Sequence, residues 1–272
     1  MANNFYLKGK QKDKYIPCFA GIMAAGIPED MLGSIPERIE RMPTGSKILD
    51  AVLAGGYEKD VLTIIYGPAG TGKTTLCILG GCAAARAGKK VIYLDSENNF
   101  SVERMQQLAP GDFTQLFDRF IFLRPTTFAE QQDMFEKLKS VVNQKVGLVV
   151  VDTIGMLYRL ALSNGENAYK ANQALGQQIL SLSEIARKKN IPVLIANQVY
   201  ADFENKGKVK MVGGELLRYS GKCLMEVSLS AQGVRSLWLR KHRSLSSDRH
   251  FYFKIVPTGI LGIKEPAPFR WR

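Results

Sequence analysis

The sequence predicts an α/β fold in which a mostly parallel central sheet is flanked by helices. Apolar runs typical of strands alternate along the chain with longer segments of helical pattern. A glycine-rich phosphate-binding loop stands between the first of these strands and the first helix. A later β-branched run ends in Asp152, as a central parallel strand does when it delivers a carboxylate at its carboxyl end.

The predicted elements follow one another in regular order. A strand at 61–66 precedes a helix at 73–87, and the later pairs are 90–95 with 101–108, 119–124 with 128–144, and 146–152 with 167–189, before a strand at 191–196. After residue 222 only short strand-like runs remain, at Cys223–Leu229, Val234–Arg240 and His250–Val256. Tight connections such as Ala231-Gln232-Gly233 join them, which predicts antiparallel strands at the C-terminal end of the sheet.

The phosphate-binding loop is complete. Its glycines allow consecutive backbone N–H groups to turn onto a phosphate, Lys73 can reach the β and γ oxygens, and the Thr74 hydroxyl can coordinate Mg²⁺. The carboxylate of Asp152 is of the kind that holds the water shell of this metal, so Thr74 and Asp152 are the predicted metal residues. The predicted nucleotide-binding residues are Gly67, Pro68, Ala69, Gly70, Thr71, Gly72, Lys73, Thr74 and Thr75.

Composition favours a globular protein with a polyanionic partner. The chain is 46% hydrophobic and 23% charged, which excludes fibrous and disordered classes. Its net charge is +12, and residues 199–272 hold 14 basic against 6 acidic side chains. Because release of counterions from phosphates drives binding to basic proteins, this asymmetry favours nucleic acid, although a basic surface without a partner remains an alternative.

Cysteines and the N-terminal region indicate a reduced, cytosolic protein. The four cysteines, Cys18, Cys77, Cys82 and Cys223, include no Cys-x-x-Cys pair. The apolar stretch from Ile16 to Ile27 is too short to span a membrane and makes a poor secretory signal. Residues 1–41 are expected to be a loosely ordered extension, a short helical cap or a gene-model artefact, since Met42 is an alternative start.

Several stretches, in this order, resemble the RecA/RadA recombinase superfamily. They are Pro43–Asp50 with Ala54–Gly56, Tyr93–Glu97, Phe100–Arg104, Val150–Ile154 and Ile195–Val199. The resemblance covers residues 42 to 263 and is greatest to short archaeal paralogues that have no helix-hairpin-helix domain. It implies a RecA-type P-loop NTPase core at 42–272 with ATP and Mg²⁺ as cofactors.

The resemblance also assigns catalytic roles. Glu97 corresponds to the carboxylate that activates the attacking water, and Gln198 to the amide that senses the γ-phosphate. Lys241 and Arg243 correspond to cations that reach the nucleotide of a neighbouring subunit, and with Lys73 these residues form the predicted catalytic set. Asn98 and Asn99 stand where glycines are usual, so the presentation of Glu97 can differ from that of the superfamily.

Two stretches, 155–170 and 199–222, correspond to the DNA-binding loops of the superfamily. The predicted DNA-binding residues are Arg159, Lys206, Lys208, Lys210 and Arg218, and Tyr200, Phe203 and Tyr219 could stack on bases. Solvated basic loops would show the same residues.

The implied function is ATP and DNA binding in DNA repair and homologous recombination, with slow ATP hydrolysis and an accessory role beside the main recombinase. Implied partners are DNA, single-stranded or branched, and the main recombinase or a junction nuclease; a homo-oligomer, a cytoplasmic location and no membrane contact are also expected. Residues 1–41 do not match the superfamily's Phe-x-x-Ala polymerisation motif, so filament formation is not implied. Two alternatives remain: a ring-forming ATPase of the KaiC or replicative-helicase type, and a non-enzymatic scaffold ordered by ATP.

Overall fold

The computed structural model describes residues 39–201, 209–230 and 233–265. The chain divides into two units, Met1–Ile39 and Glu40–Arg272, and the described helices and strands belong to the second. Residues 1–38 of the predicted extension, and Ala231 and Gln232 of a predicted connection, lie outside the described ranges.

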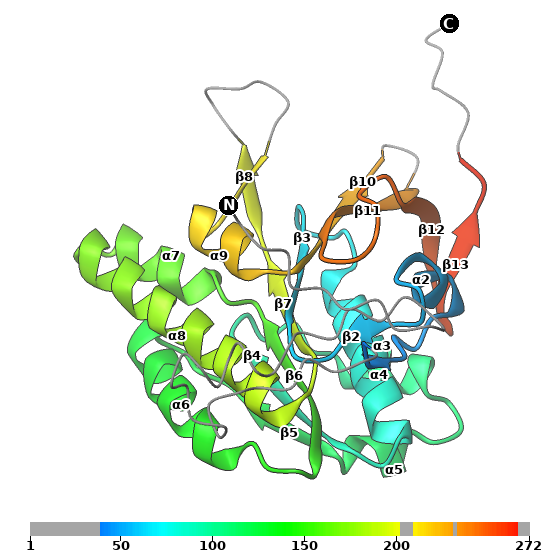
Figure 1. Ribbon diagram of the computed structural model, residues 1–272, viewed down its shortest axis with the longest axis horizontal. Helices are drawn as coiled ribbons and strands as arrows, with labels where there is room; N and C mark the ends of the chain where they lie inside the picture. Colours follow the sequence, from blue (N-terminus) through cyan, green and yellow to red (C-terminus); the bar gives the residue numbers. More distant parts are fainter. Residues whose placement is uncertain (1–38, 202–208, 231–232, 266–272) are drawn as a thin grey trace, which may run out of the picture. The chain divides into compact units, whose positions relative to one another are not determined.

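The predicted α/β architecture is confirmed. Within the described ranges, nine strands form one sheet in the order β13-β12-β11-β10-β3-β7-β6-β4-β5 (Figure 1). The parallel part contains β3 (Leu62–Tyr66), β4 (Lys90–Asp95), β5 (Phe120–Leu123), β6 (Val146–Asp152) and β7 (Val193–Asn197). The C-terminal part adds β10 (Cys223–Leu229), β11 (Arg235–His242), β12 (His250–Val256) and β13 (Gly259–Ile263).

The C-terminal strands differ from the prediction in two respects. β10 pairs in parallel with β3, so the antiparallel pairing begins only between β10 and β11. β11 ends two residues later than predicted, at His242 instead of Arg240, so it also contains Lys241. Extended pairing with β10 up to His242, opposite Cys223, explains the extra length.

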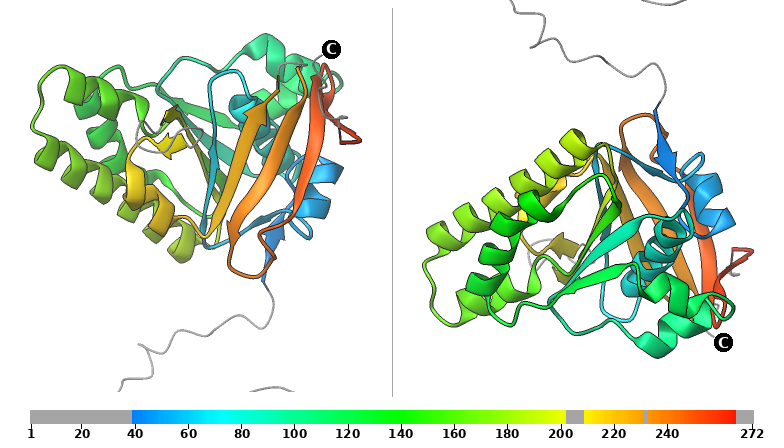
Figure 2. Two further views of the ribbon diagram at one scale, coloured as in Figure 1. Left: turned by 90° about the horizontal axis from the view of Figure 1, so that it is seen from above. Right: turned by 90° about the horizontal axis from the view of Figure 1, so that it is seen from below.

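Helices cover both faces of the sheet. The predicted helices are α3 (Lys73–Arg86), α4 (Val102–Leu108), α6 (Phe128–Val141) and α8 (Ala168–Lys189), and the additional ones are α2 (Lys47–Val52), α5 (Phe113–Phe117), α7 (Met156–Ser163) and α9 (Gly214–Ser220). Figure 2 shows α6, α7 and α8 grouped on one side of the sheet and α2 to α5 on the other.

Alternation along the strands builds these two layers. Val149 and Val151 of β6 pack with the α6–α8 layer, whereas Val150 packs with the α2–α5 layer. Because successive side chains of a strand point to opposite faces, a continuous apolar run fills both cores at once. The three described cysteines, Cys77, Cys82 and Cys223, are buried and form no disulfide.

Local capping explains where the predicted helices begin. Ser101, Thr127 and Asn167 accept hydrogen bonds from backbone N–H groups three residues later, at the starts of α4, α6 and α8. α8 ends at Lys189, and the next residue, Asn190, has a φ of 49° in the left-handed region that stops a helix. None of the helices in the described ranges is long and apolar enough to cross a membrane.

Two small two-stranded sheets complete the described fold. β1 (Arg41–Met42) pairs with β2 (Tyr57–Glu58), and β8 (Val199–Ala201) pairs with β9 (Val209–Met211). Arg41 falls on the extension side of the predicted boundary, yet it forms an ion pair of 3.0 Å with Glu58.

Two helical glycines provide a test of the packing. A Cβ atom at Gly176 of α8 would meet nothing within 4 Å, whereas one at Gly81 of α3 would lie 2.6 Å from the Phe120 ring. We expect Gly176→Ala to raise the free energy of unfolding by about 0.5 to 1 kcal/mol, because alanine restricts the unfolded chain and favours helix. Gly81→Ala should lower it by about 1 to 3 kcal/mol through overpacking. Urea denaturation measures both free energies of unfolding. If the two substitutions change this free energy in the same direction, the result would contradict this packing.

Candidate nucleotide site

The carboxyl ends of four parallel strands meet at one edge of the sheet. Register places Asp95 of β4 beside Asp152 of β6, and Asp152 beside Ala196 of β7. Tyr66, the last residue of β3, pairs with Asn197. The phosphate loop, Glu97, Thr153 and Gln198 each follow one of these strand ends, so the fold brings the predicted nucleotide and catalytic residues of this edge together.

The phosphate loop is shaped by its glycines and closed around Lys73. Gly70 and Gly72 have φ values of 75° and 101°, which side chains rarely tolerate. A Cβ atom at Gly67 would lie 2.0 Å from the Val227 carbonyl oxygen of β10. Lys73 is 7% exposed, and its Nζ donates to the carbonyl oxygens of Gly67 and Pro68 at 2.9 and 2.8 Å.

The position of Lys73 suits an anion. Burial lowers the pKa of its ammonium group, while the carboxylates of Asp152 and Glu97 oppose the shift. A phosphate placed in the loop would supply the negative charge that this buried ammonium lacks at close range.

Asp152 has one oxygen held and one oxygen free. The side chain is 1% exposed, and Oδ2 accepts a hydrogen bond of 2.9 Å from the hydroxyl of Tyr93. In the described part of the chain Oδ1 has no hydrogen-bond partner. The pKa of Asp152 is raised to about 6, chiefly by burial and to a smaller extent by the Asp95 and Glu97 charges, while Thr74 and Tyr93 oppose the shift.

A buried carboxylate with an unpartnered oxygen beside a threonine hydroxyl fits Mg²⁺. Oxygen ligands are those this ion prefers, and it keeps most of its water shell in such sites. Thr74 and Asp152 are therefore the residues of this chain that would hold it directly or through water.

The candidate base and the candidate sensor are hydrogen-bonded to each other. Glu97 Oε1 accepts from Gln198 Nε2 at 2.8 Å and from Thr153 Oγ1 at 2.6 Å. Asn99 Nδ2 donates to Glu97 Oε2 at 2.8 Å. Asn98 has a φ of 55° and occupies the left-handed conformation that a glycine would take there, which asparagine tolerates better than most residues.

Sequence reasoning missed three contributors to this edge. Thr153 and Ser96 join the ends of β6 and β4, because Ser96 Oγ donates to the Thr153 carbonyl oxygen at 2.6 Å. Tyr93 lies inside β4, and its hydroxyl reaches the Asp152 carboxylate at 2.9 Å. The adjacency of Thr153 to Asp152 and of Ser96 to Glu97 was the signal that could have found the first two.

β11 also reaches the phosphate loop. Arg235, its first residue, donates from Nη2 to the Gly70 carbonyl oxygen at 3.2 Å. Because the C=O and the next N–H of a peptide point in opposite directions, this contact favours a Thr71 N–H that points away from Arg235.

The structure does not bring Lys241 and Arg243 to this edge. β11 runs antiparallel to β10, so its carboxyl end lies at the opposite edge of the sheet. Lys241 Nζ donates to the Arg218 carbonyl oxygen at 3.1 Å, and Arg243 binds Glu58 at 2.6 Å and Asp60 at 2.8 Å. Their role toward a neighbouring subunit stays a prediction.

The predicted DNA-binding residues are distributed over α7, β9 and α9. Arg159, Lys210 and Arg218 are exposed and described, whereas Lys206, Lys208 and Phe203 lie outside the described ranges. Of the predicted stacking residues, Tyr219 is 71% exposed and Tyr200 is 45% exposed.

Two buried contacts tie this region to the nucleotide edge. Asn197 Nδ2 donates to the Val212 carbonyl oxygen at 2.8 Å, and the Val212 N–H donates to the Gln198 carbonyl oxygen at 3.1 Å. They close the base of the β8–β9 hairpin beside the candidate sensor.

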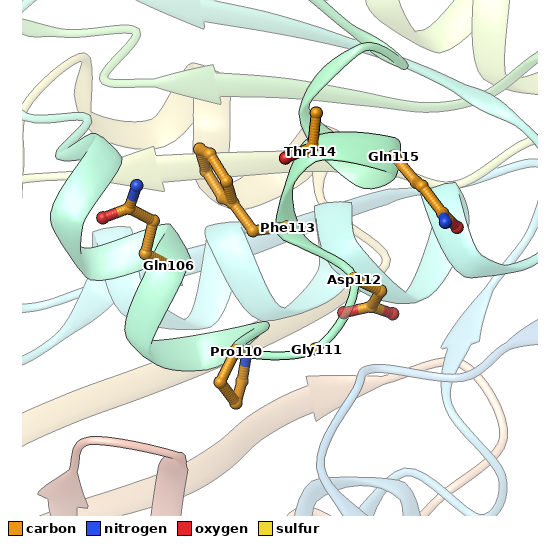
Figure 3. Close-up of a pocket in the computed structure, with 7 residues that line it drawn as sticks. All are labelled: Gln106, Pro110, Gly111, Asp112, Phe113, Thr114 and Gln115. Atoms are coloured by element: carbon orange, nitrogen blue, oxygen red, sulfur yellow. The ribbon is translucent and has the colours of Figure 1, made fainter.

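A surface pocket of about 530 Å³ lies elsewhere, between α4 and α5. Figure 3 shows Gln106 on one helix, Phe113 on the next, and Asp112 in the loop between them. The carboxylate of Asp112 forms an ion pair with Arg86, whose Nε lies 2.8 Å from it. The pocket lacks cations and glycine-rich backbone, so it does not resemble a phosphate site.

Several known proteins are similar to this chain in sequence or in fold. The sequence model of the Rad51 family matches residues 36–260. The "DNA repair and recombination protein RadB" of Methanococcus maripaludis is 39% identical over 214 residues, which are 78% of this chain and 97% of the relative. The protein of the same name from Methanothermobacter thermautotrophicus is 36% identical, and the match covers 81% of this chain and 95% of that relative. A solved structure, "Crystal structure of the RadB recombinase", matches with a TM-score of 0.69 and 37% identity, covering 80% of this chain and 98% of that one.

The buried Asp152 carboxylate predicts a pH dependence. Because its pKa is near 6 in the folded protein and 3.8 in the reference state, the folded state loses stability as pH rises from about 4 to 6. In metal-free buffer Asp152→Asn should therefore be more stable than the parent above pH 6, by on the order of 1 to 3 kcal/mol, and equally stable near pH 4. Urea denaturation at pH 4 and 7 measures this, with the exposed Asp133→Asn as control. An Asp152→Asn protein less stable at pH 7 would refute it.

Proposed function

Because this chain belongs to the Rad51 family, we propose that it binds ATP with Mg²⁺ at the phosphate loop and couples the bound nucleotide to DNA binding in repair and recombination. Its similarity to the RadB proteins and the RecA-type core agree with the resemblance found in the sequence. The proposal goes beyond family membership: it states that the chain binds ATP, Mg²⁺ and DNA and hydrolyses ATP slowly.

One contact carries the proposal: the 2.8 Å hydrogen bond from Gln198 Nε2 to Glu97 Oε1. Gln198 follows β7 and begins the segment that leads into the β8–β9 hairpin. A γ-phosphate in the loop offers the Gln198 amide a more highly charged acceptor than Glu97. If the Gln198 amide exchanged Glu97 for the γ-phosphate as its acceptor, Glu97 would lose this contact and the base of the hairpin would shift at the same time.

The residues around the loop account for ATP binding. Backbone N–H groups near Gly70 and Gly72 would cradle the β-phosphate, and Lys73 would exchange its two carbonyl acceptors for phosphate oxygens. When bound, Mg²⁺ would offset phosphate charge, with Thr74 and the free Oδ1 of Asp152 as its holders.

Hydrolysis is expected to be slow because three donors restrain Glu97. Three donors, from Gln198, Thr153 and Asn99, already occupy the two carboxylate oxygens. An attacking water needs one of these oxygens as its acceptor, and it must compete with these donors for an oxygen that faces the γ-phosphate. The proposal therefore includes weak turnover.

DNA is proposed to lie over the β8–β9 hairpin and the neighbouring ends of α7 and α9. Arg159 and Lys210 would contact phosphates, and the exposed rings of Tyr200 and Tyr219 would stack on bases. The RadB relatives are named for DNA repair and recombination, which supports a role in these two processes. We propose that this role is accessory to the main recombinase and is carried out in the cytoplasm.

The nucleotide proposal has a direct test. Lys73→Ala should weaken binding of a fluorescent ATP analogue with Mg²⁺ by at least about 100-fold, because a charge-assisted contact is lost and the phosphate is left unpaired. Glu97→Gln should keep binding within about 2-fold and abolish turnover. Retention of the analogue by Lys73→Ala would refute the site. If Glu97→Gln keeps full function in DNA binding and repair, that result would instead favour the ATP-ordered scaffold. A parent protein that forms a stable hexamer and translocates would favour the ring ATPase.

The DNA proposal has its own test. Removing two phosphate contacts with Arg159→Ala and Lys210→Ala should reduce the slope of log affinity against log salt by about 1.4 for single-stranded DNA. Fluorescence anisotropy between 50 and 200 mM salt measures the slope. Lys139→Ala with Lys188→Ala, which removes two partners of Glu184, is the matched control. A slope unchanged in the first variant would place DNA elsewhere.

A further inference from the structure

We propose that Asn99 is a positioning residue that restrains Glu97 and limits the rate of ATP hydrolysis. The inference rests on the proposed ATP-binding function and adds to it a residue of this chain that sets the rate. It starts from the hydrogen bond of 2.8 Å between Asn99 Nδ2 and Glu97 Oε2.

The backbone around Asn99 is held on both sides. Asp95, which is 2% exposed, accepts from the backbone N–H of Asn99 at 3.0 Å and from that of Phe100 at 3.2 Å. The Phe100 ring packs against Tyr93 and Phe122, with centroids 5.1 and 4.6 Å away. The fold therefore sets the position from which the Asn99 amide approaches Glu97.

Asn99 differs from the other two donors to Glu97. Gln198 can turn to a γ-phosphate, and Thr153 shares with Gln198 the oxygen Oε1 that this turn would relieve. Asn99 holds Oε2, and its own anchors are Asp95 and the aromatic cluster around Phe100, none of which belongs to the phosphate loop. Nucleotide binding thus gives Asn99 no alternative acceptor.

The chemistry of hydrolysis explains why this contact would slow the reaction. In hydrolysis the water oxygen attacks the γ-phosphorus, the bond from that phosphorus to the β–γ bridging oxygen breaks, and ADP and phosphate form. The proton released by the water passes to Glu97. Because the backbone of Asn99 is anchored by Asp95, its hydrogen bond to Glu97 Oε2 fixes which way the carboxylate oxygens face. Loss of the Asn99 donor should free Oε2 for the water.

The test is a gain of function. Asn99→Ala should raise kcat for ATP by about 3- to 10-fold, which is the range that the net contribution of one typical hydrogen bond gives. The Kd of a fluorescent ATP analogue should change by less than about 2-fold, since Asn99 lies outside the phosphate loop. Asn99→Gly is the second variant with the same expected gain, because glycine fits this turn without strain.

Two controls show whether the effect runs through Glu97. The double variant Glu97→Gln with Asn99→Ala should show no gain over Glu97→Gln alone. Asn143→Ala removes an asparagine that also makes local contacts, with Val141 and Lys145, at the other edge of the sheet, and should leave kcat unchanged.

The outcomes separate this inference from the proposed function. If the parent protein binds no ATP analogue, the proposed function fails and this inference with it. If the parent binds the analogue and kcat of both Asn99 variants is unchanged or lower, only the restraint by Asn99 is overturned. Turnover that becomes measurable in the variants of an otherwise inactive parent supports the restraint, and continued inactivity overturns it.

Discussion

Parallel pairing of β4, β6, β7 and β3 is the constraint on which the site depends. Parallel strands end at the same edge, so residues more than a hundred positions apart in the chain become neighbours there. The contact between Glu97 and Gln198 spans 101 positions and that between Tyr93 and Asp152 spans 59. No local feature of the chain could hold these pairs, because only the ladder of strand hydrogen bonds fixes their register.

Two ionisable side chains are buried at this same edge of the sheet, and their burial is unfavourable. Lys73 and Asp152 are both buried, and burial is the largest influence on the pKa of each. Such groups cost stability unless a partner of opposite charge is present. A bound nucleotide and its metal would supply that partner at both positions, so the site that weakens the fold is also the one that a ligand would stabilise.

The sheet has a second, differently used edge. The antiparallel return of β11 carries its first residue, Arg235, to the phosphate loop and its last residues away from it. There Arg243 is bound by the buried Glu58 and by Asp60, and Arg41 binds Glu58 as well. Any part that Arg243 plays toward another subunit must compete with these contacts, which also fasten β2 to the C-terminal strands.

The sequence alone determined the local chemistry. The glycine spacing of the phosphate loop, the apolar run that ends in Asp152 and the helix caps are short-range patterns, and each dictates a conformation through sterics or capping. The phosphate loop and the alternation of apolar runs with helical segments were enough to predict the parallel sheet, the helices on both faces and the position of Lys73, while Glu97 and Gln198 were identified from the resemblance to the RecA/RadA superfamily. Tertiary structure alone decided the rest: the Thr153 and Asn99 donors to Glu97, the Tyr93 contact to Asp152 and the parallel pairing of β10 with β3. Hydrogen-bond partners and strand neighbours depend on distances between remote segments, and such distances exist only once the sheet has formed.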